Sequence, residues 1–261
     1  MFADTVQHVA STRLFAAMSG TGQVLVYETR VATKVANAMI LPVPVLPGTE
    51  AAIKFIDLSQ FSDFFVELAS LFPQAETMVS MSAGLTSRSA TLEVIRVGAF
   101  EASIVPTIGD ISRLSRRFSF AGESILPWRR ERGVLGVLEH HYPDHAFVVY
   151  QIAKGESRLH PFAFEFTSRH RHLFFPTFHV HDGGAPPEAW FDHELYAQRA
   201  VMPESAFIPE EAPRTPRRKK FFSTWPAFVA QGQLVGRRRL GGLLPNQDTF
   251  AEPTEQAISY R

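Results

Sequence analysis

Short apolar segments separated by turn residues recur along the chain, and they constrain its fold more than any other feature. Residues 13–18 and 23–33 flank a glycine-containing turn at 19–22, which is typical of a β-hairpin. Phe is unusually frequent, with 23 residues against 5 Tyr and 3 Trp, and it favours strands and buries a large apolar area. Further strands are expected within 38–45, 146–152, 159–167 and 172–181. The sequence therefore predicts a mainly β protein.

Helical patterns are few. Residues 57–72 carry Phe and Leu at spacings of three and four, with Asp57 and Gln60 as a capping box and Pro73 as a stop, which predicts one amphipathic helix. Shorter helices are expected after Asp110 and within 130–141. Strands and helices alternate too irregularly for a doubly wound fold. We expect an α+β fold, mainly β with a few helices, built as a sandwich or as stacked antiparallel sheets.

The chain of 261 residues is long enough for one large β domain or for two fused halves. A strand containing Tyr precedes an extended apolar strand twice, at 24–27 with 38–42 and at 147–150 with 162–166. This similarity predicts two related β halves, residues 1–120 and 121–202, within a core of residues 1–202; the alternative is that hairpins resemble one another. Four prolines between 203 and 216 mark a basic and aromatic C-terminal arm, 203–261, with weak structure from Gly241 on.

Charge and cysteine content exclude several classes of function. The formal net charge is zero, so no overall field attracts the chain to nucleic acid or to an anionic membrane. The absence of cysteine excludes disulfides, thiolate metal sites and cysteine nucleophiles, and it fits a reducing compartment. Residues 1–18 lack the pattern of a signal peptide, and no apolar run reaches about 18 residues. We expect a soluble cytoplasmic protein without a membrane partner.

The histidines are the strongest candidates for chemistry. His179 and His181 lie two apart in a predicted strand, so both imidazoles would project from one side. If residues 191–198 form the returning strand, His193 could supply a third ligand to a divalent Zn, Mn or Fe ion. The alternative is a pair of polar side chains on a solvent-facing strand end. The carboxylates that could activate or orient water at such a site are Asp182 and Asp192.

The second candidate site is basic and lies in the C-terminal arm. Basic side chains with aromatic residues between them can hold phosphate and stack bases, or they can bind a protein partner or a second copy of the chain. A solvated arm is the alternative, and the neutral chain favours a protein contact over nucleic acid. The residues are Arg217, Arg218, Lys219, Lys220, Trp225, Arg237, Arg238 and Arg239.

Segments 24–27, 38–44, 55–58 and 174–183 resemble a group of uncharacterised bacterial proteins over about residues 13–198. That resemblance implies no activity and no catalytic residue. The sequence also lacks GxGxxG, GxxxxGK[ST], HExxH and GxSxG motifs. We therefore expect a binding or structural module that acts through a sheet surface or the arm. The alternative is a metal-dependent hydrolase at His179, His181 and His193, and nucleic-acid contact through the arm comes after it.

Overall fold

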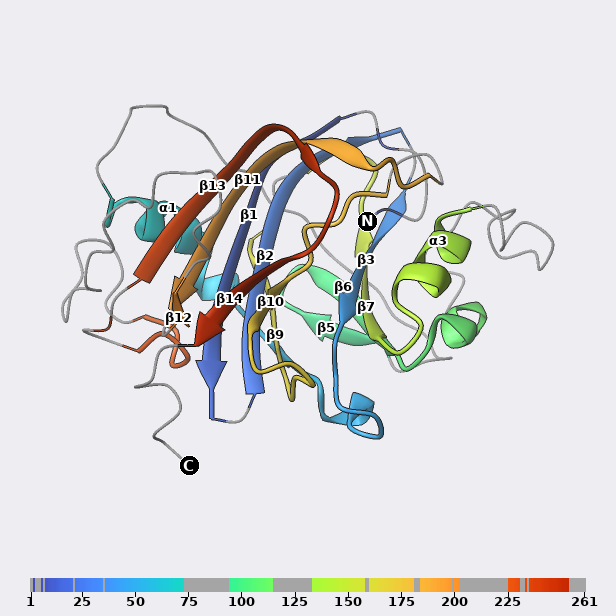
Figure 1. The fold of residues 1–261 in the computed structure, drawn as a ribbon, viewed down its shortest axis with the longest axis horizontal. Helices are drawn as coiled ribbons and strands as arrows, with labels where there is room; N and C mark the ends of the chain where they lie inside the picture. The colour runs from blue at the N-terminus through green and yellow to red at the C-terminus, as the bar shows by residue number, and fades with distance from the viewer. Residues whose placement is uncertain are drawn as a thin grey trace.

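The computed structural model describes most of the chain. Described are Phe2, Val6 and Gln233 together with residues 8–20, 22–34, 36–72, 94–114, 133–157, 160–180, 184–198, 200–201, 225–230 and 235–253. These residues form a mostly β structure of several sheets with short helices at its periphery (Figure 1). The predicted fold class is confirmed.

The largest sheet has seven strands in the order β13-β11-β1-β2-β9-β4, with β8 paired to β2. The predicted hairpin forms its centre, and β1 also pairs in parallel with β11 while the other pairs are antiparallel. Gly22 begins the second hairpin strand, where a Cβ would lie 2.6 Å from the carbonyl oxygen of Phe166. The strands are β1 (His8–Ser19), β2 (Gly22–Thr33), β4 (Lys54–Ile56), β8 (Gly155–Ser157), β9 (Phe162–Phe166), β11 (Glu188–Gln198) and β13 (Val235–Pro245).

Two smaller sheets complete the β structure. One has the order β3-β7-β6-β5, and Pro42 lies in its edge strand β3, as expected for a residue that cannot donate to a ladder. The other has the order β10-β14-β12. Their strands are β3 (Asn37–Val43), β5 (Ile95–Val97), β6 (Phe100–Val105), β7 (Ala146–Ile152), β10 (Leu173–Phe175), β12 (Ala200–Val201) and β14 (Thr249–Pro253).

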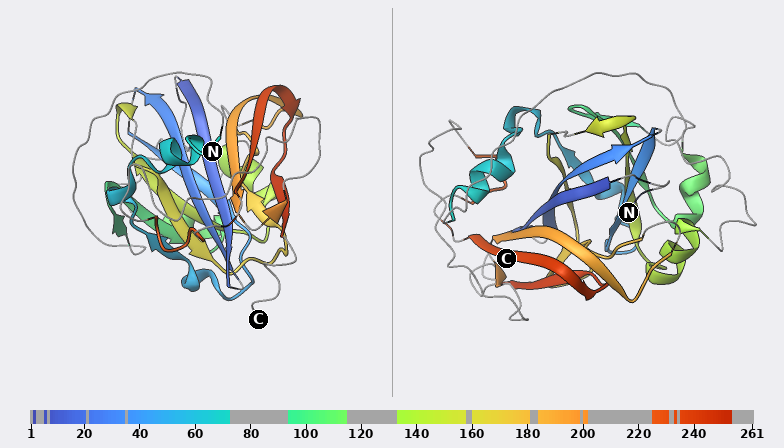
Figure 2. Two further views of the ribbon diagram at one scale, coloured as in Figure 1. Left: turned by 90° about the vertical axis from the view of Figure 1, so that its left-hand side faces the viewer. Right: turned by 90° about the horizontal axis from the view of Figure 1, so that it is seen from above.

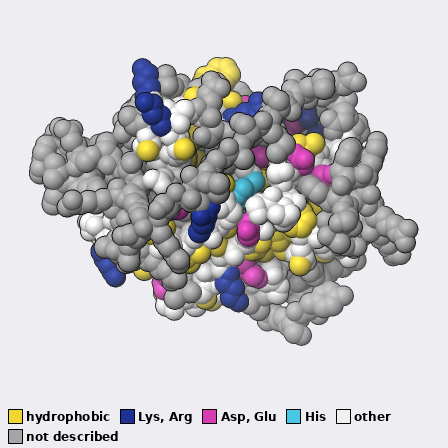
Figure 3. Space-filling model, turned by 180° about the vertical axis from the view of Figure 1, so that it is seen from behind, with side chains coloured by type: hydrophobic (Ala, Val, Ile, Leu, Met, Phe, Trp, Pro, Cys, Tyr) yellow, Lys and Arg dark blue, Asp and Glu magenta, His cyan; other side chains and the backbone are white. Residues whose placement is uncertain are grey.

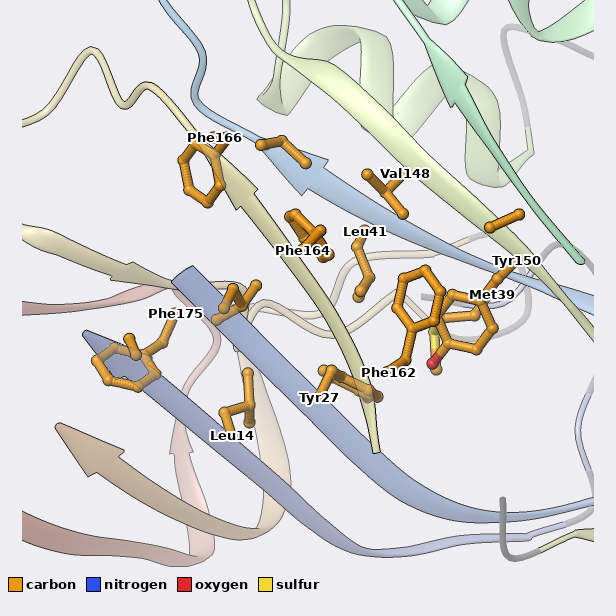
Figure 4. Packing of buried hydrophobic residues seen from close by; sticks show 14 of the residues in the cluster. Leu14, Tyr27, Met39, Leu41, Val148, Tyr150, Phe162, Phe164, Phe166 and Phe175 are labelled. Atoms are coloured by element: carbon orange, nitrogen blue, oxygen red, sulfur yellow. The ribbon is translucent and has the colours of Figure 1, made fainter. Parts of the chain in front are cut away.

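The main core lies between the sheets and is dominated by aromatic rings. Phe162, Phe164 and Tyr27 from the large sheet meet Tyr150 and Leu41 from the four-stranded sheet (Figure 4). The ring centroids of Tyr150 and Phe162 are 4.4 Å apart. The abundance of Phe is thus used to fill the space between sheets, where its ring needs no hydrogen-bond partner.

Short helices cover the outer faces of the sheets at opposite ends of the molecule (Figures 1 and 2). Helix α3 (Val134–His141) and the 3-10 helix η3 (Ile108–Arg113) share a core cluster with β3 and β7. Helix α1 (Phe64–Ala69) and the 3-10 turn η2 (Ser59–Phe61) cover part of the large sheet, and η1 (Glu50–Ala52) precedes β4. The helix at 134–141 agrees with the sequence prediction, whereas the segment expected to be a helix after Asp110 is a 3-10 helix that begins at Ile108, with Thr107 at its N-cap.

The helix expected over 57–72 is shorter than predicted. The Asp57 carboxylate accepts a hydrogen bond from the Ser59 backbone, and the chain then makes a 3-10 turn before α1 begins at Phe64. The residues that the apolar stripe marked as inward are still buried or half-buried. A 3-10 turn followed by a short α-helix therefore buries the stripe that suggested one continuous helix.

The C-terminal residues differ from the expectation of weak structure beyond Gly241. β13 pairs with β11 along its whole length, and β14 pairs with both β10 and β12. Gly241, Gly242 and the preceding arginines have weak strand propensity, so this strand is stabilised by its pairing with β11 and by the burial of Val235 and Leu240. The sheets therefore include residues on both sides of the expected boundary at 202.

The strands of the two predicted halves are interleaved. β2 from the first half pairs with β9 from the second, and β3 from the first pairs with β7 from the second. Among the described residues, no helix is long and apolar enough to span a membrane.

Candidate functional site

A row of alternating charges crosses the outer face of the large sheet, the face on which α1 lies. Arg239, Glu194, Arg13 and Glu28 are successive cross-strand neighbours on β13, β11, β1 and β2. Nε of Arg239 donates to Glu194 at 3.1 Å, and Nε of Arg13 donates to Glu28 at 2.7 Å. Opposite charges directly across strands stabilise this register. This row of charges divides the outer face into two halves. Helix α1 covers one half, and the other half is open.

The covered half contains several residues of the predicted basic site. Trp225 is 5% exposed and packs edge-on to Phe64 with centroids 6.3 Å apart. Arg237 is 3% exposed, and its guanidinium lies 4.5 Å from the ring centroid of Phe72. These two residues of the expected C-terminal arm are therefore buried against the large sheet and are not on a solvated arm.

Of the remaining basic residues, the structure describes Arg238 and Arg239, which point to opposite faces of β13. Arg238 is half-buried on the opposite face of β13 from Arg237, and burial lowers its pKa. Arg239 pairs with Glu194. Seen from the back, the described surface mixes hydrophobic side chains with acidic and basic ones (Figure 3). Arg217, Arg218, Lys219 and Lys220 lie outside the described residues.

The open half carries the most exposed large apolar side chains of the described residues. Trp190 on β11 is 76% exposed, and its cross-strand neighbour Leu243 on β13 is 53% exposed. Glu188 and Asp192 stand two residues to either side of Trp190 and are also exposed. Single exposed apolar residues are ordinary, but an adjacent Trp and Leu make a contiguous patch. We call this surface the open face: Glu188, Trp190, Asp192, Gly241, Leu243 and Pro245.

A cavity of about 290 Å³ adjoins the open face and shares Trp190 and Asp192 with it. Its walls come from the start of β1, from β11 and from the irregular segment 176–180. We call it the histidine cavity, because His179 and His193 both line it. The other lining residues are Phe2, Val6, Val9, Ala10, Thr12, Tyr27, Pro176, Phe178 and Val180.

The two cavity histidines are in direct contact. Their Nε2 atoms lie 3.2 Å apart, and the His179 ring stacks on Phe191 with centroids 4.4 Å apart. The Asp192 backbone N–H donates to Nδ1 of His193 at 3.3 Å, so the neutral His193 ring carries its proton on Nε2 and donates it to His179. Burial lowers the pKa of His193 to about 4, which keeps that ring neutral near pH 7.

Segment 176–180 is positioned by polar side chains from the turn between β13 and β14. The Asn246 side chain accepts from the His179 N–H at 2.7 Å and donates to the His179 carbonyl at 2.8 Å. The Asp248 carboxylate accepts from the Phe178 N–H at 3.0 Å and from the Tyr142 hydroxyl at 2.6 Å. This segment is not a strand, contrary to the expectation for His179, because its backbone bonds to side chains rather than to a neighbouring strand.

Asp192 has a structural role at a β-bulge. The register between β1 and β2 shifts between Ala10 and Arg13, and Ser11 within this bulge has a φ of 54°. The Asp192 carboxylate accepts a hydrogen bond of 2.7 Å from the Ser11 N–H. A left-handed backbone is costly for Ser, so this bond helps to hold the cavity wall in place.

Two of the three histidines predicted to bind metal lie together in the structure. Residues 191–198 are a strand, and His179 and His193 meet as the sequence suggested. His181 and Asp182 lie outside the described residues. Within the described part of the chain, no group of three or more His, Asp or Glu side chains is arranged to hold a metal ion. The described residues supply two imidazoles, one of them protonated on the nitrogen that would bind.

Trp190 and Leu243 were not anticipated as site residues, although the sequence contains a signal for Trp190. In residues 188–195, Glu188, Trp190, Asp192 and Glu194 alternate with inward side chains. Trp190 thus occupies a position in the polar phase of a strand, where a large apolar side chain is unexpected. Leu243 has no comparable signal, because it follows two glycines in a segment of weak strand propensity.

The architecture defines a class of protein: stacked β-sheets with one open, partly apolar sheet face and an adjoining cavity. No protein-family model matches the chain, so the resemblance to uncharacterised bacterial proteins stays a prediction. The fold is similar to that of a mutated baculovirus P35 after caspase cleavage, with a TM-score of 0.50 and 11% identity over 94% of this chain and 100% of that one.

Two further solved structures align less well. Baculovirus P35 gives a TM-score of 0.48 with 10% identity over 95% of this chain and 97% of that one. The caspase-8/P35 complex gives 0.49 with 9% identity over 94% of this chain and 97% of that one.

Proposed function

We propose that this chain is a protein-binding module and that it binds its partner through the open face. The observation that carries this proposal is the 76% exposure of Trp190 beside Leu243 on a rigid sheet. Trp is enriched among the residues that dominate binding energy at protein interfaces. Strand pairing fixes the backbone at both positions, so no backbone segment has to be ordered there on binding.

The P35 fold supports a proteolytic enzyme as the first class of partner to test. The similar structure is that of a baculovirus P35 after cleavage by a caspase. From this similarity we take only the class of partner to test, which is a protease that binds an exposed surface of this chain. A cytoplasmic partner fits the cysteine-free composition.

Direct binding to purified proteases, caspases first, tests the proposal. The chain, a Trp190→Ala/Leu243→Ala variant and a Val66→Ala control would be immobilised side by side. Val66 is a suitable control because it is a 47% exposed apolar residue on α1, away from the open face. We expect the double variant to bind at least about tenfold more weakly and the control to bind as the parent does. Equal binding by all three forms would refute a role for the open face.

We propose a metal-dependent hydrolase as a second candidate function: a metal ion would displace the proton that His193 donates to His179 and bind both Nε2 atoms, which lie 3.2 Å apart. Two imidazoles on one tetrahedral zinc ion, each about 2.0–2.1 Å from it, are separated by about 3.3 Å. Elemental analysis of the purified chain and of His193→Ala tests this candidate. Stoichiometric metal that is lost in a folded variant would support it, and a metal-free chain after incubation with zinc, manganese or iron would reject it.

A further inference from the structure

We infer that the histidine cavity receives an aromatic side chain of the partner, and that a basic residue stands beside it in the partner's sequence. This inference rests on the proposed function, since it names the partner group that would anchor binding at the open face. The cavity and the open face share Trp190 and Asp192, so a partner seated on the face also lies over the cavity.

The size of the cavity suits a single ring. Its volume is about 290 Å³, whereas an apolar cavity of about 150 Å³ already binds benzene. Pockets for drug-sized ligands start at about 300 Å³. A phenyl, phenol or indole group therefore matches the available space.

The walls combine apolar rings with a polar end, and the polar groups at that end are already hydrogen-bonded within the protein. Phe2, Tyr27, Phe178 and Trp190 contribute rings to the lining, and aromatic pairs are stabilised beyond the burial of their area. The imidazoles at the polar end hydrogen-bond to each other through Nε2. The Asp192 carboxylate already accepts from Ser11. An apolar ring can enter without breaking these bonds.

Two carboxylates stand on the open face, one of them at the edge of the cavity. Asp192 lies at the rim, and Glu188 stands four residues before it on the same face of β11. Their cross-strand neighbours on β13 are Gly241 and Pro245, which supply no basic side chain. A carboxylate can accept several hydrogen bonds, so Asp192 can bind a cation while it holds Ser11. An Arg or Lys next to the aromatic residue would complement this charge.

Short capped peptides test the cavity without the partner. N-acetyl-phenylalaninamide would be titrated into the full chain, with N-acetyl-alaninamide as the matched probe, while NMR follows the ring signals of His179 and His193. We expect saturable shifts with the aromatic probe alone, and binding at least about tenfold weaker in Ala10→Phe, which fills the cavity. A second variant, Trp190→Ala, removes one wall at an exposed position and should weaken binding in the same direction.

A second pair of probes tests the charge. N-acetyl-Phe-Arg-amide should bind more tightly than N-acetyl-Phe-Glu-amide, and added salt should reduce the difference. No shift with any aromatic probe, or unchanged binding in both cavity variants, would overturn the inference while leaving protein binding by the open face intact. Probe binding in the cavity together with protease binding that ignores Trp190 and Leu243 would instead reject the proposed function.

Discussion

Two titratable side chains contact segment 176–180, the half-buried Asp248 and the buried His193, and their pKa values are shifted in opposite directions. Asp248 accepts from Phe178 and Tyr142, and burial raises its pKa from 3.8 to about 6. His193 contacts His179, and burial lowers its pKa from 6.5 to about 4. Each group favours its neutral form in the fold, so the same segment depends on pH in two opposing ways.

Asp248 should make the folded protein lose stability as pH rises from about 4 to about 6. In this range the folded state retains a proton on Asp248 that the unfolded state has released, and the shift corresponds to about 3 kcal/mol. Asp248→Asn keeps an acceptor for the Phe178 N–H and cannot ionise, and its amide N–H would donate to the Tyr142 oxygen instead of accepting from the hydroxyl. Urea unfolding between pH 3.5 and 7.5 should show that the loss of stability between about pH 4 and 6 is missing in the variant. If the free energy of unfolding depends on pH identically in both proteins, Asp248 is not the group responsible.

His193 contributes the opposite dependence. Because the pKa of His193 in the folded state lies below 6.5, the stability that its neutral ring contributes is fully present above pH 6.5. That contribution is lost as the pH falls towards about 4. NMR titration of the imidazole signals measures this directly, with the exposed His140 as an internal comparison. We expect the His193 signal to stay in its neutral position down to about pH 5. Titration of His193 near 6.5 would show that the ring is not buried against the sheet.

At the scale of elements, the outer face of the large sheet depends on α1. Phe64 is fully buried, and its ring centroid lies 5.4 Å from that of Phe15 and 5.2 Å from that of Phe65. Phe64→Ala should therefore reduce the free energy of unfolding by about 3–5 kcal/mol. Val66→Ala, on the exposed side of the same helix, should change it by less than about 0.5 kcal/mol. Similar losses in the two variants would indicate that α1 does not dock as described.

The sequence predicts which side chains face inward better than it predicts how long each element is. Periodicity marked Phe64, Phe65 and Leu68 as inward-facing, and they are buried. The predicted start of the helix at Asp57 was wrong, because an Asx turn at Asp57 leads into a 3-10 turn. The spacing of apolar residues alone does not distinguish a 3-10 turn from an α-helix. β13 could not be predicted from its own residues, since the pairing with β11 lies far away in the sequence.

The candidate site was also only partly predictable from the sequence. The contact between His179 and His193 was anticipated, because β11 has clear alternation and could be treated as a returning strand. The cavity was not, because it depends on Asn246 and Asp248, which position segment 176–180 from a turn about 70 residues later. Non-local hydrogen bonds of this kind leave no periodic pattern in a sequence.

At the scale of the whole molecule, the interleaved strands make the two halves interdependent. β2 pairs with β9 and β3 pairs with β7, so each half completes sheets in the other. Residues 1–120 and 121–261, produced separately, should each lack protected amides in hydrogen exchange, because each leaves unpaired strand edges. Mixing them should restore protection in β2 and β9. A fragment that is protected alone would show that its half folds independently.

We propose that this β protein binds another protein through the open face, and site-specific photo-crosslinking would detect that contact. A photoreactive phenylalanine analogue would replace Trp190 in one preparation and Val66 in another, and each would be irradiated with the captured protease. We predict a covalent adduct from position 190 and none from position 66, since only the first lies on the open face. An adduct from position 66 alone, or from neither position in a complex that binds, would contradict the claim.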